Sequence, residues 1–184
     1  VGRSSAADDF SDLQQTLCEL APAENDRYPW NDIGNGRLFA DIFKDIARFV
    51  PERKQWHIYD GTRWVSDTGS LKAMELCKAL ANALMRYALD IHDEHKRKSY
   101  IDFCRKWQSR HMRITILSDA QSVYPISMQE FDSDRFLFNC ANGTLDLRTM
   151  EFREHSAEDR LTKITPLRPH PPRFSAQRKR VILR

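Results

Sequence analysis

Two histidines and a set of aspartates are the residues of this sequence whose types and spacing could hold a metal ion. His92 and His95 are three residues apart, so a helix would direct both imidazoles to one side. No third ligand stands at a useful spacing, and a charged, solvated bend is the simpler interpretation. The aspartates fall mostly in predicted turns, where Asp is favoured for local hydrogen bonding. They are Asp32, Asp60, Asp67, Asp132, Asp134 and Asp146.

The sequence lacks the short motifs of several catalytic classes. It has no G-x-x-x-x-G-K-[ST] loop for nucleotide phosphates, no nucleophile elbow and no H-E-x-x-H motif. We therefore predict that this chain is not itself catalytic and uses no cofactor and no metal. A metal-dependent nuclease built on the Asp and His residues is the enzymatic alternative, and incubation with DNA and Mg²⁺ or Mn²⁺ tests it.

Positive charge concentrates between residues 96 and 113. Tyr100, Phe103, Cys104 and Trp107 form an apolar stripe in the same stretch, which predicts an amphipathic helix. Cations on such a helix can follow a phosphate backbone, although a charge run is usually a solvated face. The candidate DNA-binding residues are Lys96, Arg97, Lys98, Arg105, Lys106, Arg110 and Arg113.

The bulk composition is that of a folded, highly charged protein. The chain has 184 residues, of which 41% are hydrophobic and 30% charged, and its net charge of +3 is only mildly basic. Its four cysteines form no C-x-x-C pair, so buried reduced thiols are expected instead of a zinc site. With no apolar run of about eighteen residues and no signal-peptide pattern, we expect a soluble cytoplasmic protein without a membrane partner.

Apolar residues at helical spacing predict most of the secondary structure. The first predicted helix covers residues 10–20, and the second begins near Asn31, a candidate cap, and continues to Phe49, where Pro51 stops it. The longest predicted helix covers residues 70–91, with Leu71 on its apolar face. A further helix at residues 110–123 places Ile114 on its apolar face.

Two hairpins are predicted between and after these helices. Residues 55–66 flank an Asp60-Gly61 turn, and Trp56, Ile58 and Trp64 are expected to pack on the neighbouring helix. Residues 131–152 contain an Asn142-Gly143 turn, with a short third strand near residues 151–153. The fold class is therefore α+β, mainly α: a helical domain with small antiparallel β-hairpins.

Alternation along the second hairpin predicts which side chains are buried. Leu145 and Leu147 are expected to face inward, because apolar and polar residues alternate on this strand. Asp146, which lies between them, is expected to point outward to a basic partner such as Arg148.

Several ordered motifs resemble the domain that precedes the superfamily 3 helicase in phage and plasmid primase–helicases, and in the poxvirus primase–helicase. The resemblance covers roughly residues 31–163, and motifs in this order are more specific than any one alone. They are Asn31 to Asn35, Trp56 to Asp67, Phe131-Asp132, Phe136 to Asn139, Asn142 to Thr149, Glu154-His155 and Glu158 to Lys163.

The resemblance implies a role in DNA replication and a division of the chain into three parts. Residues 1–30 would be an N-terminal helix and linker, residues 31–165 the helicase-preceding domain, and residues 166–184 a flexible basic tail. Neither an ATPase motor nor a primase is present within these residues, so the implied function is a non-catalytic module that couples a ring helicase to primase and DNA. Its implied partners are DNA and the helicase ATPase and primase domains of the same or a parent protein, in a bacterial or phage-infected cell.

A collar-like oligomerisation module without direct DNA contact is the main alternative, and it would make the chain a homo-oligomer. An exposed apolar patch would favour this alternative, whereas a basic patch would favour DNA contact.

Overall fold

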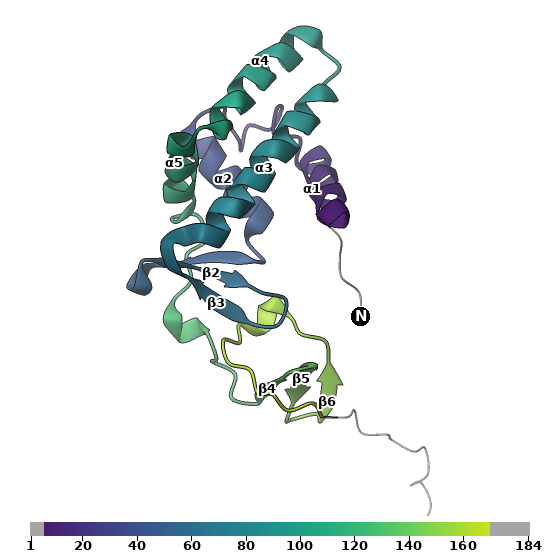
Figure 1. Cartoon of the computed structure of the whole chain (residues 1–184), viewed down its shortest axis with the longest axis vertical. Coiled ribbons are helices and arrows are strands. Elements are labelled where there is room, and N and C mark those ends of the chain that lie inside the picture. Colours follow the sequence, from purple (N-terminus) through teal and green to yellow (C-terminus); the bar gives the residue numbers. More distant parts are fainter. Residues whose placement is uncertain (1–5, 170–184) are drawn as a thin grey trace, which may run out of the picture.

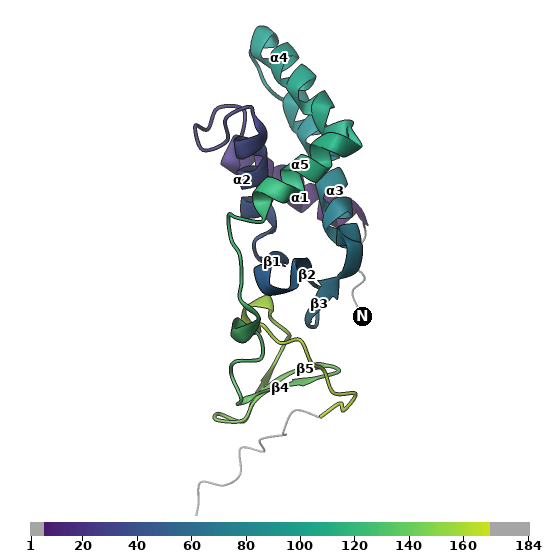
Figure 2. The same ribbon diagram turned by 90° about the vertical axis from the view of Figure 1, so that its left-hand side faces the viewer.

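The computed structural model describes residues 6–169 as helices at one end, a first sheet in the middle and a second sheet at the other end (Figures 1 and 2). This confirms the predicted class, α+β and mainly α. The helices are α1 (Ala6–Leu20), α2 (Asp32–Phe43), α3 (Leu71–Leu89), α4 (Glu94–Arg105) and α5 (Arg110–Ala120). The strands are β1 (Ala47–Val50), β2 (Gln55–Tyr59) and β3 (Trp64–Asp67), then β4 (Leu137–Cys140), β5 (Gly143–Asp146) and β6 (Glu151–Arg153).

The helical part is built around α3, which contacts α1, α4 and α5, while α2 packs on α5. Apolar residues recur along α3 at three- and four-residue steps, so one face is buried. Leu80 and Leu84 on that face are fully buried together with Phe39 from α2 and Trp107. The predicted linker also joins this core, because Pro22, Ala23 and Tyr28 are buried.

The second helix begins as predicted but ends earlier. Asn31 caps α2, since its Oδ1 accepts the backbone N–H of Gly34 at 3.0 Å. The prediction that the helix continues to Phe49 is wrong, because residues 47–50 form β1 and pair with β2. Val50 and Phe49 favour extended structure, and β2 supplies hydrogen-bond partners that a longer helix would leave unused.

The first hairpin forms with the predicted turn. Asp60 Oδ1 accepts the backbone N–H groups of Thr62 at 2.8 Å and Arg63 at 3.0 Å, which is the local bonding that favours Asp in turns. Trp56 and Ile58 join the helical core as predicted. Trp64 instead belongs to a second apolar cluster, with Val50, Ile126 and Phe131, so its predicted contact with the neighbouring helix is wrong.

Two residues assigned to apolar helix faces are exposed. Leu71, at the first position of α3, is 71% exposed, and Ile114 in α5 is 50% exposed. Ile116 is fully buried in place of Ile114. The contact with α2 decides which face of α5 is buried. The spacing of apolar residues in the sequence does not reveal that contact.

The second hairpin and its third strand are confirmed, but the face that the sheet buries is reversed. Asn139 and Thr144, which pair across β4 and β5, are 6% and 1% exposed. Leu147 is 46% exposed, so its predicted inward orientation is wrong. The reason is Asn139, whose Nδ2 donates to the carbonyl oxygens of Thr62 and Lys163, each at 3.0 Å, and so holds the polar face inward.

The chain after β6 returns to the second sheet. Leu167 accepts the backbone N–H of Ala141 at 2.9 Å, and Pro169 accepts the side-chain amide of Asn142 at 3.2 Å. Residues 170–184, most of the predicted tail, lie outside the described residues.

All four cysteines are free thiols, and Cys77, Cys104 and Cys140 are buried as the sequence led us to expect. Burial raises the pKa of the Cys77 and Cys104 thiols to about 12 each. These thiols are therefore protonated at neutral pH, whereas Cys18 is exposed.

Candidate nucleic-acid interface

The seven predicted DNA-binding cations lie on α4, on the short 3-10 turn Lys106–Gln108 and on α5. Asp93 caps α4 by accepting the N–H of Lys96 at 2.7 Å, and Ser109 caps α5. Trp107, between them, is fully buried and fixes the turn to the core. Because the turn breaks the single predicted helix, the seven cations do not form one continuous stripe.

Two of the seven, Arg97 and Arg113, bind backbone carbonyl oxygens. Arg97 Nη1 donates to Ile91 at 3.1 Å. Arg113 Nη1 donates to Trp107 at 3.0 Å and to Gln108 at 2.6 Å. Both side chains are half-buried, so each helps to close the end of a helical segment.

Two more cations form ion pairs near the surface. Lys96 Nζ lies 3.0 Å from the Glu24 carboxylate, and Arg105 Nη1 lies 2.8 Å from Asp102. Exposed pairs of this kind contribute little to stability and remain open to exchange with a phosphate. Within the described part of the chain, no ion pair is formed by the other three predicted cations, Lys98, Lys106 and Arg110.

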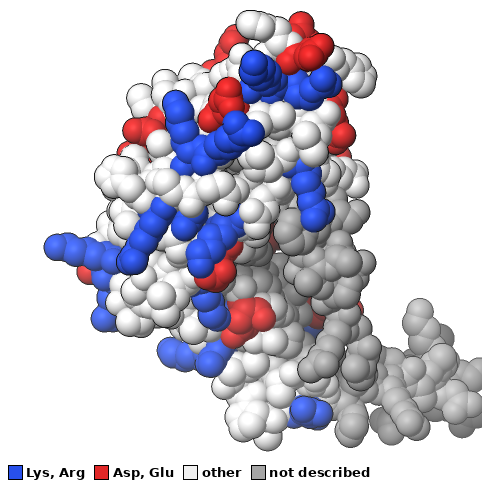
Figure 3. Space-filling model, turned by 45° about the horizontal axis from the view of Figure 1, so that its top comes forward, with Lys and Arg blue, Asp and Glu red and all other residues white. Residues whose placement is uncertain are grey.

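On the face seen in Figure 3, Lys and Arg side chains are spread over the surface among uncharged residues, and several of them lie next to Asp or Glu side chains. This distribution suits several separate contacts along a phosphate backbone more than one deep anion site.

A groove between α3 and α5 brings cations from distant parts of the sequence together. It has a volume of about 790 Å³ and is lined by Lys72 and Lys78 from α3 and by Arg110 and Arg113 from α5. Glu75 is the acidic residue of its lining and pairs with Lys78 at 2.6 Å. We call this feature the α3–α5 groove; its apolar lining residues are Ile58, Leu71, Met74 and Leu76.

The sequence predicted half of this charged lining and missed the other half. Arg110 and Arg113 were among the candidate DNA-binding residues, whereas Lys72 and Lys78 lie on a helix assigned only to the core. Their positions on the exposed side of α3 are visible in the sequence, but their proximity to α5 depends on tertiary packing.

The carboxylate of Asp41 is the centre of a polar network on the surface of α2. It accepts hydrogen bonds from Arg27 Nε at 2.6 Å, Tyr124 OH at 2.7 Å and Tyr28 OH at 2.9 Å. Burial alone would raise the pKa of Asp41, but these hydrogen bonds outweigh it and lower the pKa below its usual value. Burial, together with Asp41, raises the pKa of Tyr28 to about 12. The network connects the segment before α2, α2 itself and the segment after α5. Arg27 and Asp41 neutralise each other within it.

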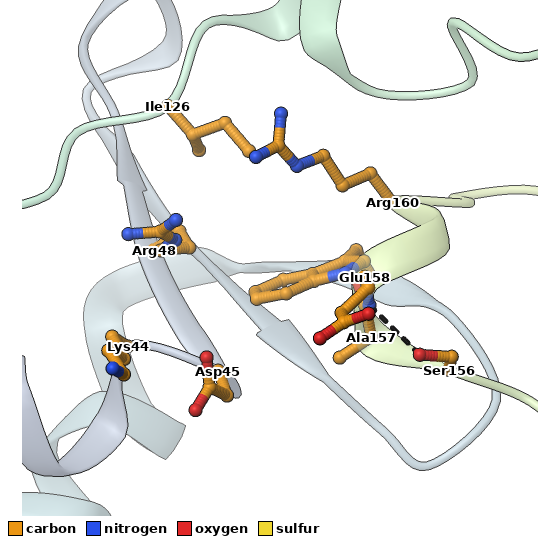
Figure 4. A pocket seen from close by; sticks show the side chains of 9 residues that line it. Lys44, Asp45, Arg48, Ile126, Ser156, Ala157, Glu158 and Arg160 are labelled. Carbon is orange, nitrogen blue, oxygen red and sulfur yellow. Dashed lines mark hydrogen bonds between the residues drawn. The ribbon is translucent and has the colours of Figure 1, made fainter.

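A second cleft, of about 620 Å³, lies between the first sheet and the segment after β6. Lys44, Asp45 and Arg48 project from one side, and Glu158 and Arg160 from the other (Figure 4). Arg160 is also paired with Glu130. Because its lining carries both signs of charge, this cleft is less suited to a polyanion than the α3–α5 groove.

Five of the six aspartates that could have formed a metal site have another partner. Asp67 accepts the backbone N–H groups of Lys72 at 3.0 Å and Ala73 at 2.9 Å in the first turn of α3. Asp132 accepts the backbone N–H of Thr162 at 2.8 Å, and Asp146 binds Arg148 as predicted. Over residues 6–169, no three His, Cys, Asp or Glu side chains are arranged to hold a metal ion.

The chain matches the family described as D5 N terminal like over residues 36–180, which is most of its length. The chain belongs to the D5 N-terminal-like family. This domain is found N-terminal to superfamily 3 helicases in the D5-type primase–helicases of phages, plasmids and poxviruses, which confirms the resemblance seen in the sequence. No curated protein matches the chain closely enough to extend this assignment.

In this D5 N-terminal-like domain, the motifs that carry the resemblance build the scaffold. Asn31 caps α2, Asn142-Gly143 forms the β4–β5 turn, and Asn139 ties the second sheet to the first. None of the helices described is long and apolar enough to cross a membrane.

Proposed function

We propose that this chain is the non-catalytic module of a D5-type primase–helicase, coupling the ring helicase to primase and DNA. Membership of the D5 N-terminal-like family supports the replication context. DNA contact is supported by one observation above the others: two elements distant in sequence, α3 and α5, bring four cations and a single acidic residue to the α3–α5 groove. The exposed cations of α4 and the following turn would extend this surface.

DNA binding measured over a range of salt concentrations tests the proposal. The groove variant is Lys72→Ala with Lys78→Ala and Arg110→Ala. The helix variant is Lys98→Ala with Arg105→Ala and Lys106→Ala. Both sets leave Arg97 and Arg113 in place, because those side chains bind backbone carbonyl oxygens.

We expect both variants to bind DNA more weakly than the wild type. The slope of log K against log salt should fall by roughly 0.7–0.9 for each phosphate that the variant no longer neutralises. A matched control removes three exposed cations from the first sheet region, Lys44, Arg53 and Lys54, and should change binding little. Wild-type affinity in both test variants, or equal weakening in the control, would refute the proposed interface.

The nuclease alternative predicts a different result in the same samples. Cleavage of DNA by the purified chain with Mg²⁺ or Mn²⁺ would contradict a non-catalytic role. Loss of that cleavage in the groove variant would then place the activity at the groove.

A further inference from the structure

The α3–α5 groove carries accessible apolar side chains as well as cations. Leu71, the first residue of α3, is 71% exposed and belongs to neither of the two apolar clusters. Met74, one turn further along α3, is half-buried and lines the same groove. A single exposed leucine on a protein surface needs no explanation. Leu71 differs because it lies in a hollow, beside a second apolar side chain and among four cations.

The backbone before α3 fixes the position of Leu71. Gly69 and Ser70 have φ angles of 74° and 57°, in the left-handed region, which is uncommon for a residue with a side chain such as Ser. The carboxylate of Asp67 then accepts the backbone N–H groups of Lys72 and Ala73 at 3.0 Å and 2.9 Å. This tight turn holds the first turn of α3, with Leu71 and Lys72, at the groove.

We propose that the α3–α5 groove binds an unpaired DNA strand, with its phosphates at the cations and its bases against Leu71 and Met74. The flat face of a base is aromatic and becomes accessible to a protein side chain when the strand is unpaired. The thioether of Met also makes favourable contacts with aromatic rings. This inference rests on the proposed function, because it specifies the form of DNA that occupies the groove.

A DNA duplex would make poor use of this lining. A duplex keeps the faces of its bases stacked inside, and proteins reach its base edges with a helix or a pair of strands that enters a groove of the DNA. The α3–α5 groove is instead a hollow of about 790 Å³ between two helices, with Leu71 and Met74 in its lining. A duplex lying across it would offer phosphates to the cations but no base face to the apolar residues.

The charges of the groove complement a phosphate backbone. Lys72 on α3 and Arg110 on α5 are exposed, and neither forms an ion pair within residues 6–169. The acidic side chain of the lining, Glu75, is neutralised by Lys78 at 2.6 Å. Both helices therefore offer a cation to a strand whose bases contact the apolar residues.

Fluorescence anisotropy of the full chain with three DNA probes of equal length tests the inference. The probes are an oligothymidylate, an abasic strand with the same phosphates, and a duplex; the wild type should bind the oligothymidylate most tightly. Leu71→Ala should weaken oligothymidylate binding at least about fivefold, because a base loses its apolar contact. Its affinity for the abasic strand and its salt dependence should stay as in wild type, since Leu71 carries no charge. Leu89→Ala is the control, because Leu89 is 63% exposed at the other end of α3.

A variant with a larger ring tests the same contact in the opposite direction. Leu71→Phe should bind the oligothymidylate more tightly than wild type and the abasic strand equally, because a phenyl ring stacks on a base. Circular dichroism verifies that each variant is folded. Equal wild-type affinity for the oligothymidylate and the abasic strand, or for the duplex, would overturn the inference, as would a Leu71→Ala variant that binds like Leu89→Ala.

The groove variant separates this inference from the proposed function. If removal of Lys72, Lys78 and Arg110 weakens binding of all three probes while Leu71→Ala has no effect, the groove contacts phosphates alone and the inference falls. Wild-type binding of every probe by the groove variant would instead remove the proposed DNA contact at the groove, and this inference with it.

Discussion

Asn139 donates its side-chain amide to the carbonyl oxygen of Thr62 at 3.0 Å, across the boundary between the two sheets. The same amide group donates to Lys163 at 3.0 Å, so both of its N–H groups are used. Asn139 is 6% exposed, and these bonds explain why a polar residue is buried in a sheet whose opposite face is apolar.

Replacing Asn139 should destabilise the protein. Asn139→Ala leaves two carbonyl oxygens without a donor and should lower the free energy of unfolding by about 1–3 kcal/mol. Asn139→Asp, almost the same shape, should cost more at neutral pH because a carboxylate would face two carbonyl oxygens. Urea denaturation measures both, and Asn82→Ala on the exposed side of α3 is the control, expected within about 0.5 kcal/mol of wild type. Equal stability of Asn139→Ala and Asn82→Ala would contradict this role.

Gly36 permits the close approach of α2 and α5. A Cβ atom at this position would lie 2.7 Å from Cβ of Asp119 and 3.0 Å from the backbone nitrogen of Ala120. An Ala in place of Gly within a helix ordinarily stabilises by about 0.5–1 kcal/mol. Here we expect the opposite sign, a destabilisation of about 1–3 kcal/mol, because the helices must separate.

Thermal and urea denaturation of Gly36→Ala provide the measurement. Arg37→Ala, at the neighbouring exposed position, is the control and should change stability little. Increased stability of Gly36→Ala would contradict this expectation, because it would show that α2 and α5 can separate at little cost in free energy.

His57 should make stability depend on pH. It is buried, its ring stacks on Phe131 with centroids 5.3 Å apart, and its Nδ1 has no hydrogen-bond partner within the described residues. Burial lowers the pKa of His57 below its usual value of 6.5. The unfolded state therefore takes up the proton first, so stability is complete above pH 6.5 and falls as pH drops below that value towards the folded pKa.

His57→Phe keeps the aromatic contact with Phe131 and removes the titrating group. The difference in the free energy of unfolding between pH 7 and pH 5 should be smaller in this variant than in wild type. The comparison isolates His57, because the carboxylates titrate equally in both proteins. The same difference in the two proteins would mean that other groups cause it.

The local elements followed from the sequence because their causes are local. The apolar spacing of residues 71–89 is sufficient to place α3, and the Asp60-Gly61 and Asn142-Gly143 pairs are sufficient to place two turns. Asn31 was recognised as a cap because its bonding partner is three residues away. The family was also evident, since its motifs are strings of neighbouring residues.

Packing decided the remaining features, because the partners are far apart in the chain. Residues 47–50 form a strand because β2 supplies their hydrogen-bond partners. Lys72 and Lys78 line the same groove as Arg110 because α3 packs against α5. Alternation located the apolar and polar faces of the second sheet but could not say which one is buried. A bond from Asn139 to a carbonyl oxygen 77 residues earlier settled that orientation. The sequence by itself thus determined the helices, the turns and the family, whereas only the tertiary structure decided which surfaces are exposed, since exposure depends on what every other segment covers.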